Sequence, residues 1–408
     1  MRRAAPGGAV ALAVGIALAL PTGDLSLAQA PSTLTIYSSL PLQGDSRPQS
    51  ADVVRGEKLA LADAGGHAGG FSIHFLSLDD ATAAAGKWDP HQAFRNAQLA
   101  ANDASTIAYL GEFNSGATAV SLPILNHAGI PQVSPSNTYV GLTRSEGAEP
   151  DEPDKYYPSG TRTYARVAPA DHIQAAALAR YMRLTGVRSV YLLNDKEVYG
   201  HGMALLLRRA ARREGIKVTG FLGIDARARS YSGVARLVHR SHSQAAFYGG
   251  ITDNGAARLF NALHREGSRM KLFGPDGVAE SFFTRRLTKG AAKRTYITNT
   301  ALYEGAYNAR GRRFVRGFRA KYHHHPEPYA IYGYEAMSLV LDAITRAAPR
   351  SNDRQAVVAA LFATRDRASV LGRYSIDANG DTTLPLYTGL RVSKAGGLRY
   401  DRTIHVEL

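Results

Sequence analysis

The sequence predicts an α/β fold with parallel sheets, arranged in more than one compact body. The chain has 408 residues, whereas one hydrophobic core seldom serves more than roughly 250–300. Hydrophobic residues make up 45% and charged residues 20%, an ordinary globular composition. From Leu34 onward, short β-branched or aromatic segments alternate with segments of helical periodicity. This alternation is typical of βαβ units, whose strands pair in parallel.

Nine strands are expected in the first three quarters of the chain, each short and rich in β-branched or aromatic residues. They lie at residues 34–38, 71–76, 107–111, 130–134, 189–194, 218–224, 245–249, 270–274 and 296–300. Short strands are also expected around residues 373–376, 387–392 and 403–406. Because these are too few for a third domain, we expect them to complete the two earlier bodies.

Helices are expected between the strands because apolar residues recur at i, i+3, i+4 and i+7. Four such stripes face the sheets: Ala175, Leu178, Ala179 and Met182; Met203, Leu206, Leu207 and Ala210; Ala256, Leu259, Phe260 and Leu263; Met337, Val340, Leu341 and Ile344.

Residues 145–163 interrupt this rhythm, because their prolines and glycines can continue neither a helix nor a strand. We expect a long surface loop there, and the alternation restarts at Arg166. The chain therefore crosses to a second lobe at this point. The expected lobes are residues 31–167 with 301–383, and residues 168–300 with 384–408.

The N-terminus has the pattern of a removable signal peptide, predicted at residues 1–30. Arg2 and Arg3 precede an apolar run at residues 9–20, and Ala28-Gln29-Ala30 supplies small residues at the spacing that signal peptidase cuts. A retained membrane anchor is the alternative, but this run is shorter than the ~20 residues that span a bilayer. We expect a secreted or periplasmic protein, cleaved near Ala30, with no membrane span afterwards. The chain has no cysteine, which excludes a disulfide, a thiolate metal site and a lipoprotein anchor.

The formal net charge is +15, from 49 Lys and Arg against 34 Asp and Glu. Such an excess attracts acidic surfaces, nucleic acid among them. The basic residues are scattered along the chain, and the run at residues 208–213 is interpreted as a solvated helix face. We therefore expect no nucleic-acid partner.

Candidate ligand residues follow the strands, since open parallel sheets bind ligands outside the carboxyl ends of their strands. Ser115 stands where a helix N-terminus could receive a carboxylate; the alternative is that it only caps the helix that starts near Ala117. Ser136 and Thr138 form a second polar loop, which could also be a plain turn.

Three further candidates follow strands of the second body. Tyr199 could stack on an apolar ligand, and Ile251 lies in a turn whose glycines permit close backbone approach to a ligand. Asp276 could pair with an ammonium group, or could serve only as a turn aspartate.

Taken in order, these loops resemble the branched-chain amino-acid binding proteins of ABC transporters, which are type I periplasmic binding proteins. The motifs are LPLQG at 40–44, LDD at 78–80, GEFNS at 111–115, VSPS at 133–136, NDKEVYG at 194–200, FYGG at 247–250, GPDG at 274–277 and YSIDANGD at 374–381. They span nearly the whole chain after residue 30. The resemblance implies two doubly wound parallel-sheet lobes, joined by three crossing strands, that enclose an amino acid.

The resemblance also implies roles for the candidate residues. Ser115 and Thr138, with nearby amides, would hold the α-carboxylate. The carbonyl of Ser136 and the side chain of Asp276 would hold the α-ammonium, while Tyr199 would cover the cleft. The family commonly has glutamate in place of Asp276 and an aromatic residue near Ile251, so the side-chain pocket should differ.

The expected function is capture of an amino acid or similar small zwitterion outside the cytoplasm and its delivery, by a monomer, to an ABC transporter permease. A sensor of an amino acid or amide with the same fold is the alternative. An enzyme is less expected, because no G-x-S-x-G, P-loop, H-E-x-x-H or G-x-G-x-x-G motif is present. His323, His324 and His325 cannot all converge on one ion in regular structure, and no acidic neighbour completes a ligand set. We therefore expect no catalytic residues, no metal and no cofactor.

Overall fold

The computed structural model describes residues 33–406, together with four isolated positions near the N-terminus (1, 4, 7 and 8). Apart from those positions, the predicted signal peptide and its cleavage site lie outside the described residues. Residues Ser32–Leu408 form one compact unit. None of the described helices combines the length and the apolar character that crossing a membrane requires.

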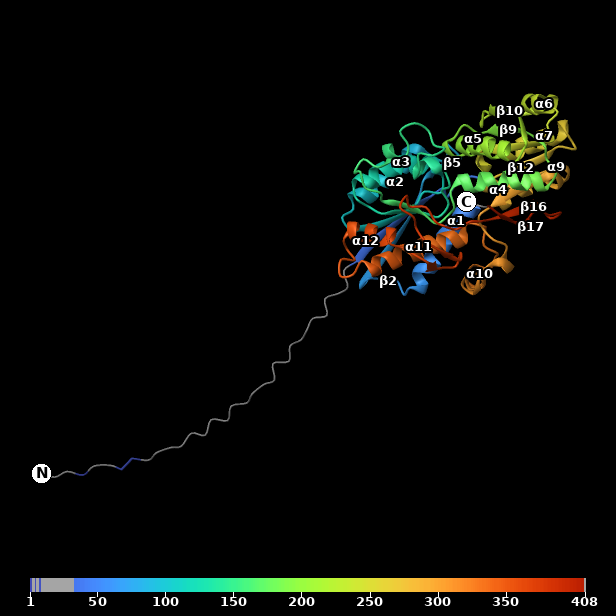
Figure 1. Cartoon of the computed structure of the whole chain (residues 1–408). Coiled ribbons are helices and arrows are strands. Elements are labelled where there is room, and N and C mark those ends of the chain that lie inside the picture. Colours follow the sequence, from blue (N-terminus) through green and yellow to red (C-terminus); the bar gives the residue numbers. More distant parts are fainter. Residues whose placement is uncertain (2–3, 5–6, 9–32, 407–408) are drawn as a thin grey trace. The chain divides into compact units, whose positions relative to one another are not determined.

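The first sheet has six strands in the order β2-β3-β1-β6-β7-β8 (Figure 1). All neighbouring strands are parallel except the short β2 against β3. The bounds are β1 Thr33–Leu40, β2 His67–Ala68, β3 Phe71–Asp79, β6 Thr106–Gly111, β7 Gln132–Ser134 and β8 Tyr164–Arg166. Setting β2 aside, the strands follow the doubly wound order 2-1-3-4-5.

The second sheet repeats this order with seven strands, β10-β9-β11-β12-β13-β16-β17. Its first five strands are parallel, whereas β16 and β17 close the edge antiparallel. The bounds are β9 Ser189–Asn194, β10 Lys217–Gly223, β11 Ala245–Gly249, β12 Lys271–Gly274, β13 Thr295–Asn299, β16 Leu386–Val392 and β17 Leu398–His405. The predicted α/β class with doubly wound parallel sheets is confirmed.

Helices cover both faces of each sheet (Figure 1). Around the first sheet, α1 packs on α11 and α2 packs on α3; around the second, α4 packs on α5 and α6 packs on α7. The bounds are α1 Arg47–Asp63, α2 Pro90–Asn102, α3 Ser115–His127, α4 Asp171–Leu184, α5 Val198–Arg213, α6 Ser232–Arg240, α7 Ala256–Glu266, α8 Ser281–Arg285, α9 Lys289–Arg294, α10 Ala309–Tyr322, α11 Ala330–Arg346 and α12 Arg354–Phe362.

Side-chain periodicity explains why these elements pack as they do. All sixteen residues of the four predicted helix stripes are buried. Along β9, Val190 and Leu192 join the core under α4 and α5, whereas Leu193 joins the core under α6 and α7. This alternation is expected of a strand whose two faces are both covered by helices.

Two details differ from the sequence predictions. Strand β8, only three residues long, was not predicted as a strand, because the preceding proline-rich segment hides it. Residues 145–163 do form a loop, but part of it is interior: Tyr156 and Tyr157 are buried. Glu152 accepts hydrogen bonds from Tyr156 (2.6 Å) and Tyr139 (2.5 Å), which hold the loop against the fold.

The chain passes between the two sheets three times. It leaves the first sheet after β8 and leaves the second after β13; α11 then packs on α1 beside the first sheet. It returns to the second sheet at β16. The carboxyl ends of β6 and β7 in one sheet therefore share a pocket with the carboxyl ends of β11 and β12 in the other.

Candidate functional site

All six residues predicted to bind ligand line a single pocket. Its lining consists of Ser115, Ser136, Thr138, Tyr199, Ile251 and Asp276, joined by Phe113, Asn114, Gly277 and Tyr329. The cavity between these side chains measures about 30 Å³, well below the roughly 300–1,000 Å³ of most small-molecule sites. The side chains are therefore packed closely together, and a ligand of amino-acid size would enter this pocket only if they move apart.

One wall of the pocket is the N-terminus of α3. Ser115 is the first residue of this helix, and the helix-capping role considered for it is not what the structure shows. Its hydroxyl instead accepts a hydrogen bond from the amide of Tyr139 (3.4 Å). The first amides of a helix have no carbonyl partner within it, and the helix dipole is positive there. This wall therefore offers donors and partial positive charge to an anionic group.

The polar loop after β7 lies beside this wall. The hydroxyl of Ser136 donates to the carbonyl of Phe113 (3.0 Å), so its side chain ties the two loops of the first sheet together. The carbonyl of Thr138 accepts from the amide of Asp171 (2.7 Å). Ser136 and Thr138 are both buried, which fixes their positions at the pocket wall.

The opposite wall carries the carboxylate of Asp276. It accepts hydrogen bonds from the hydroxyls of Tyr199 (2.5 Å) and Tyr329. Burial raises the pKa of Asp276, while the two hydroxyls oppose that rise. Burial and the charge of Asp276 raise the pKa of both tyrosines well above the ordinary value, so both remain protonated donors. Two tyrosine hydroxyls thus hold the side chain of Asp276 in place, in addition to the turn in which it lies.

A second carboxylate, Asp171, lies close behind the pocket at the start of α4. It is fully buried, and neither of its side-chain oxygens has a hydrogen-bond partner within the described part of the chain. Burial and the charge of Asp276 raise the pKa of Asp171 well above its usual range; the nearby hydroxyl of Thr138 and the charge of Arg166 lower it only in part. The side chain of Arg166 is already paired, since its Nε donates to Asp381 (2.8 Å). Asp171 and Asp276 therefore lie close together, and within the described residues neither forms an ion pair with a basic side chain.

The prediction for the glycines near Ile251 needs correction. A Cβ atom on Gly249 would lie 2.4 Å from the carbonyl oxygen of Gly200, and one on Gly250 would meet the ring of Tyr248 at 2.5 Å. We expected these glycines to let the backbone approach a ligand. They instead let segments of the protein pack closely against one another. Ile251 itself is buried and lines the pocket with its side chain.

Hydrogen bonds between the loops of the two sheets close the rim of the pocket. Asp253 accepts from the amides of Asp45 (2.7 Å) and Ser46 (3.3 Å) and from the hydroxyl of Ser46 (2.6 Å), just before α1 begins. On another part of the rim, Glu197 accepts from the indole nitrogen of Trp88 (3.0 Å) and pairs with Lys87. The structure therefore represents the arrangement in which the pocket is shut.

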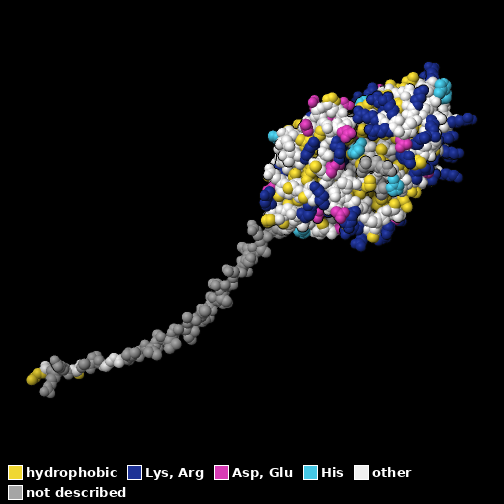
Figure 2. Space-filling model, viewed as in Figure 1, with side chains coloured by type: hydrophobic (Ala, Val, Ile, Leu, Met, Phe, Trp, Pro, Cys, Tyr) yellow, Lys and Arg dark blue, Asp and Glu magenta, His cyan; other side chains and the backbone are white. Residues whose placement is uncertain are grey.

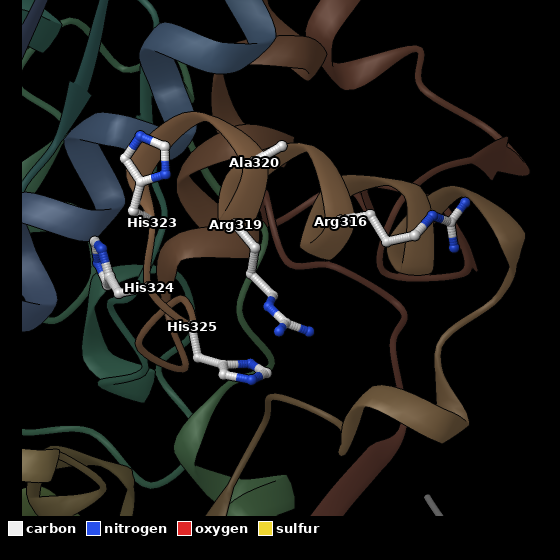
Figure 3. A pocket seen from close by; sticks show the side chains of 6 residues that line it. All are labelled: Arg316, Arg319, Ala320, His323, His324 and His325. Carbon is white, nitrogen blue, oxygen red and sulfur yellow. The ribbon is translucent and has the colours of Figure 1, made fainter.

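The three consecutive histidines lie elsewhere, after the end of α10. Their rings do not converge on one point (Figure 3), and the described residues contain no group of three ligands suited to a metal ion. The expectation that they lack an acidic neighbour is wrong: His324 Nε2 lies 3.0 Å from Asp52 Oδ1. Asp52 is distant in sequence, so only the fold brings the two together.

A fold of two doubly wound sheets with a closed polar pocket between their strand ends defines a protein that binds a small ligand. The chain belongs to the periplasmic binding protein family, whose model matches residues 33–396. It is similar to a Leu/Ile/Val-binding protein homologue of Brucella abortus, with 24% identity over 89% of this chain and 91% of that protein. The resemblance inferred from the loop motifs is thereby confirmed.

Solved structures have the same fold. A leucine-binding protein from Thermotoga maritima superposes with a TM-score of 0.80 at 20% identity, covering 91% of this chain and 99% of that one. A solute-binding protein from R. palustris in complex with benzoate superposes with a TM-score of 0.77 at 18% identity, covering 92% and 98%. Proteins of this fold therefore hold ligands of different chemistry.

Five residues at the site were not predicted: Phe113, Asn114, Asp171, Gly277 and Tyr329. The rings of Phe113 and Tyr329 pack edge to face, with their centroids 5.8 Å apart, and both rings line the pocket. Asp171 follows β8 by five residues, so the strand-end rule would have identified it had β8 been recognised. Tyr329 precedes α11 far from any strand end, and no local pattern marks it.

Proposed function

We propose that the chain captures an amino acid or a similar small zwitterion outside the cytoplasm and delivers it to an ABC transporter permease. The observation that carries this proposal is the polarity of the pocket. One wall presents the N-terminus of α3 with Ser115 and Thr138, the opposite wall presents Asp276, and none of the ten lining residues is basic. A zwitterion places an anion and a cation at those two walls.

The α-carboxylate would lie at the amides of α3, where the hydroxyls of Ser115 and Thr138 add donors. The α-ammonium would lie near Asp276 and Asp171 and donate a hydrogen bond to the carbonyl of Ser136. This position explains why Asp171 has no partner in the described structure, because a buried carboxylate requires a cation or donors when it ionises. Tyr199 would act by orienting Asp276, and Ile251 and Phe113 would contact the side chain of the ligand.

An aromatic carboxylate is the second candidate, because the R. palustris neighbour holds benzoate. Such a ligand could use the α3 wall, but it would bring no cation to the two acids of the opposite wall. Its binding would require both acids to stay protonated. The paired carboxylates therefore favour a zwitterion.

We also propose that residues 31–167 with 301–383 and residues 168–300 with 384–408 act as two lobes that close on the ligand. The bonds of Asp253 to Asp45 and Ser46 form only when the rim is shut. A ligand that contacts both walls would favour this state, since it shifts the equilibrium by its preference for the closed form.

A thermal-shift screen of residues 32–408 against amino acids, amides and aromatic acids tests the proposal, followed by calorimetry on each hit. At 100 times its Kd, a ligand adds about 2.7 kcal/mol to the free energy of unfolding. For a hit such as leucine, the analogue without the ammonium (4-methylpentanoate) and the analogue without the carboxylate (3-methylbutylamine) should each bind at least ~100-fold more weakly. Tight binding of an aromatic acid, with no response to any amino acid, would contradict the proposal.

A further inference from the structure

The net positive charge of the chain comes from the residues that build the second sheet and its helices. Residues 168–300 and 384–408 contain 26 Lys and Arg against 11 Asp and Glu, a net charge of +15. Residues 31–167 and 301–383 contain 21 against 22, a net charge of −1. Figure 2 shows Lys and Arg side chains crowded over the part of the surface formed by these helices. The scattering along the sequence therefore conceals a strong asymmetry in space.

These basic side chains also have few acidic partners. Within the described residues, only three of the 26 form an ion pair: Arg180, Arg286 and Arg402. In the other set, ten of the 21 do so. Four of the 11 acids near the second sheet are buried and cannot screen the surface: Asp171, Asp195, Asp276 and Glu280.

The topology gathers much of this charge at one edge. In a βαβ unit, each helix ends where the next strand begins, at the edge opposite the carboxyl ends that hold the pocket. Six exposed residues lie in these helix ends and strand starts, and we call them the basic edge: Arg183, Arg213, Lys217, Arg265, Arg269 and Lys293. The turns that connect α4 to β9 and α6 to β11 contain no acidic residue.

Helix dipoles explain only part of this arrangement. A basic residue in the last turn of a helix is favourable, which accounts for Arg183 and Arg213. Lys217 opens β10 and Arg269 precedes β12, so neither belongs to a helix. Nearby, burial and the charges of Arg294 and Arg391 lower the pKa of Lys271. Within the described residues, none of the six side chains of the basic edge forms an ion pair.

The chemistry of the basic edge fits a lipid surface better than another macromolecule. Protein interfaces have cores depleted of charge and enriched in aromatic residues, and surfaces for single-stranded nucleic acid interleave aromatic side chains that stack on bases. Of the exposed large hydrophobic residues in the described chain, Leu184 and Leu237 lie in these helix ends, and neither is aromatic. Anionic lipid headgroups require only cations, each contributing about a fivefold gain in partition when close to the surface.

We propose that the basic edge binds the surface of a membrane containing anionic phospholipids. The contact is electrostatic and reversible, and it involves the edge of the second sheet remote from the pocket. It does not depend on which ligand occupies that pocket. Contact with a membrane would hold the protein near any partner embedded there.

Co-sedimentation of residues 32–408, which form a compact unit, with large vesicles tests this proposal. Vesicles of phosphatidylglycerol and phosphatidylcholine in equal parts should bind the protein at 50 mM salt, and phosphatidylcholine alone should not. Raising the salt to 500 mM should reduce the partition coefficient at least ~tenfold, because exposed charges are then screened. A variant with R183Q, R213Q, K217Q and K293Q should lose at least ~tenfold in partition.

A matched variant separates the location of the charge from its total. The substitutions K58Q, R95Q, R313Q and R316Q remove four exposed positive charges from the elements around the first sheet, and partition should change less than ~threefold. Equal losses for both variants would assign the effect to net charge alone and overturn the proposal. So would an absence of vesicle binding at 50 mM salt, whether or not the protein then binds a 20-base-pair DNA duplex or an acidic protein. Thermal melting of both variants verifies that they are folded.

Discussion

Replacing Asp276 with asparagine tests the cation-binding wall of the pocket. The substitution keeps the shape of the side chain but removes its charge, and Tyr199 and Tyr329 still surround the new amide. In the closed pocket the ligand ammonium would then lack one of its two counter-ions. Altering one partner of a fully buried ion pair costs about 3–5 kcal/mol. Each 1.4 kcal/mol is tenfold, so affinity should fall by roughly 10²–10³.

The free protein should respond differently from the complex. Burial raises the pKa of Asp276, so its ionised form destabilises the folded protein without ligand. A neutral amide removes this cost, and the Tm of ligand-free Asp276→Asn should equal or exceed that of the unaltered protein. A loss of affinity with a retained Tm would separate a binding role from a structural one.

Calorimetry with an identified amino acid, together with melting curves of the free proteins, provides both measurements. Asp225→Asn is the matched control, because Asp225 is an exposed aspartate after a strand of the same sheet. Its affinity should stay within about twofold of the unaltered protein. If Asp276→Asn bound the ligand as tightly as the control, the reasoning would be refuted and Asp276 would be a turn residue.

Three further predictions concern the same pocket. Ser115→Ala should weaken binding less than Asp276→Asn, by about 1–3 kcal/mol in calorimetry, because it removes one donor and leaves the amides of α3; a larger loss than that of Asp276→Asn would contradict the roles assigned. Lowering the pH should weaken binding, because burial raises the pKa of Asp171 and its protonated form cannot pair with an ammonium; Asp171→Asn should flatten this dependence between pH 5 and 8, and an unchanged slope would oppose it. Asp253→Ala should raise the ligand dissociation rate several-fold in stopped-flow measurements, because its bonds to Asp45 and Ser46 hold only the closed rim; an unchanged rate would show that the rim does not limit release.

The periodic parts of the fold could be predicted from the sequence. Strands β9 and β11 have the predicted bounds, 189–194 and 245–249. Both sit in the interior of a sheet with helices on each side, so their residues read as continuous apolar runs. The four helix stripes were recognisable for a related reason, since each covers one face of a sheet.

The site could be predicted only where the strand-end rule applied. Ser115, Thr138 and Asp276 each follow a recognisable strand, and the structure brings all three to one pocket. Tyr329 reaches the pocket from a position 53 residues beyond Asp276, through the packing of α11 on α1. Such a long-range contact leaves no periodic trace in one sequence. The pairing of His324 with Asp52 escaped prediction for the same reason.

A crystal structure of the protein with a bound amino acid tests the central claim most directly. We predict the α-carboxylate at the amides of Ser115 and Gly116, within hydrogen-bonding distance of Thr138, and the α-ammonium within about 3 Å of Asp276. A ligand bound in the reverse orientation, or bound outside the space between Ser115 and Asp276, would contradict the account.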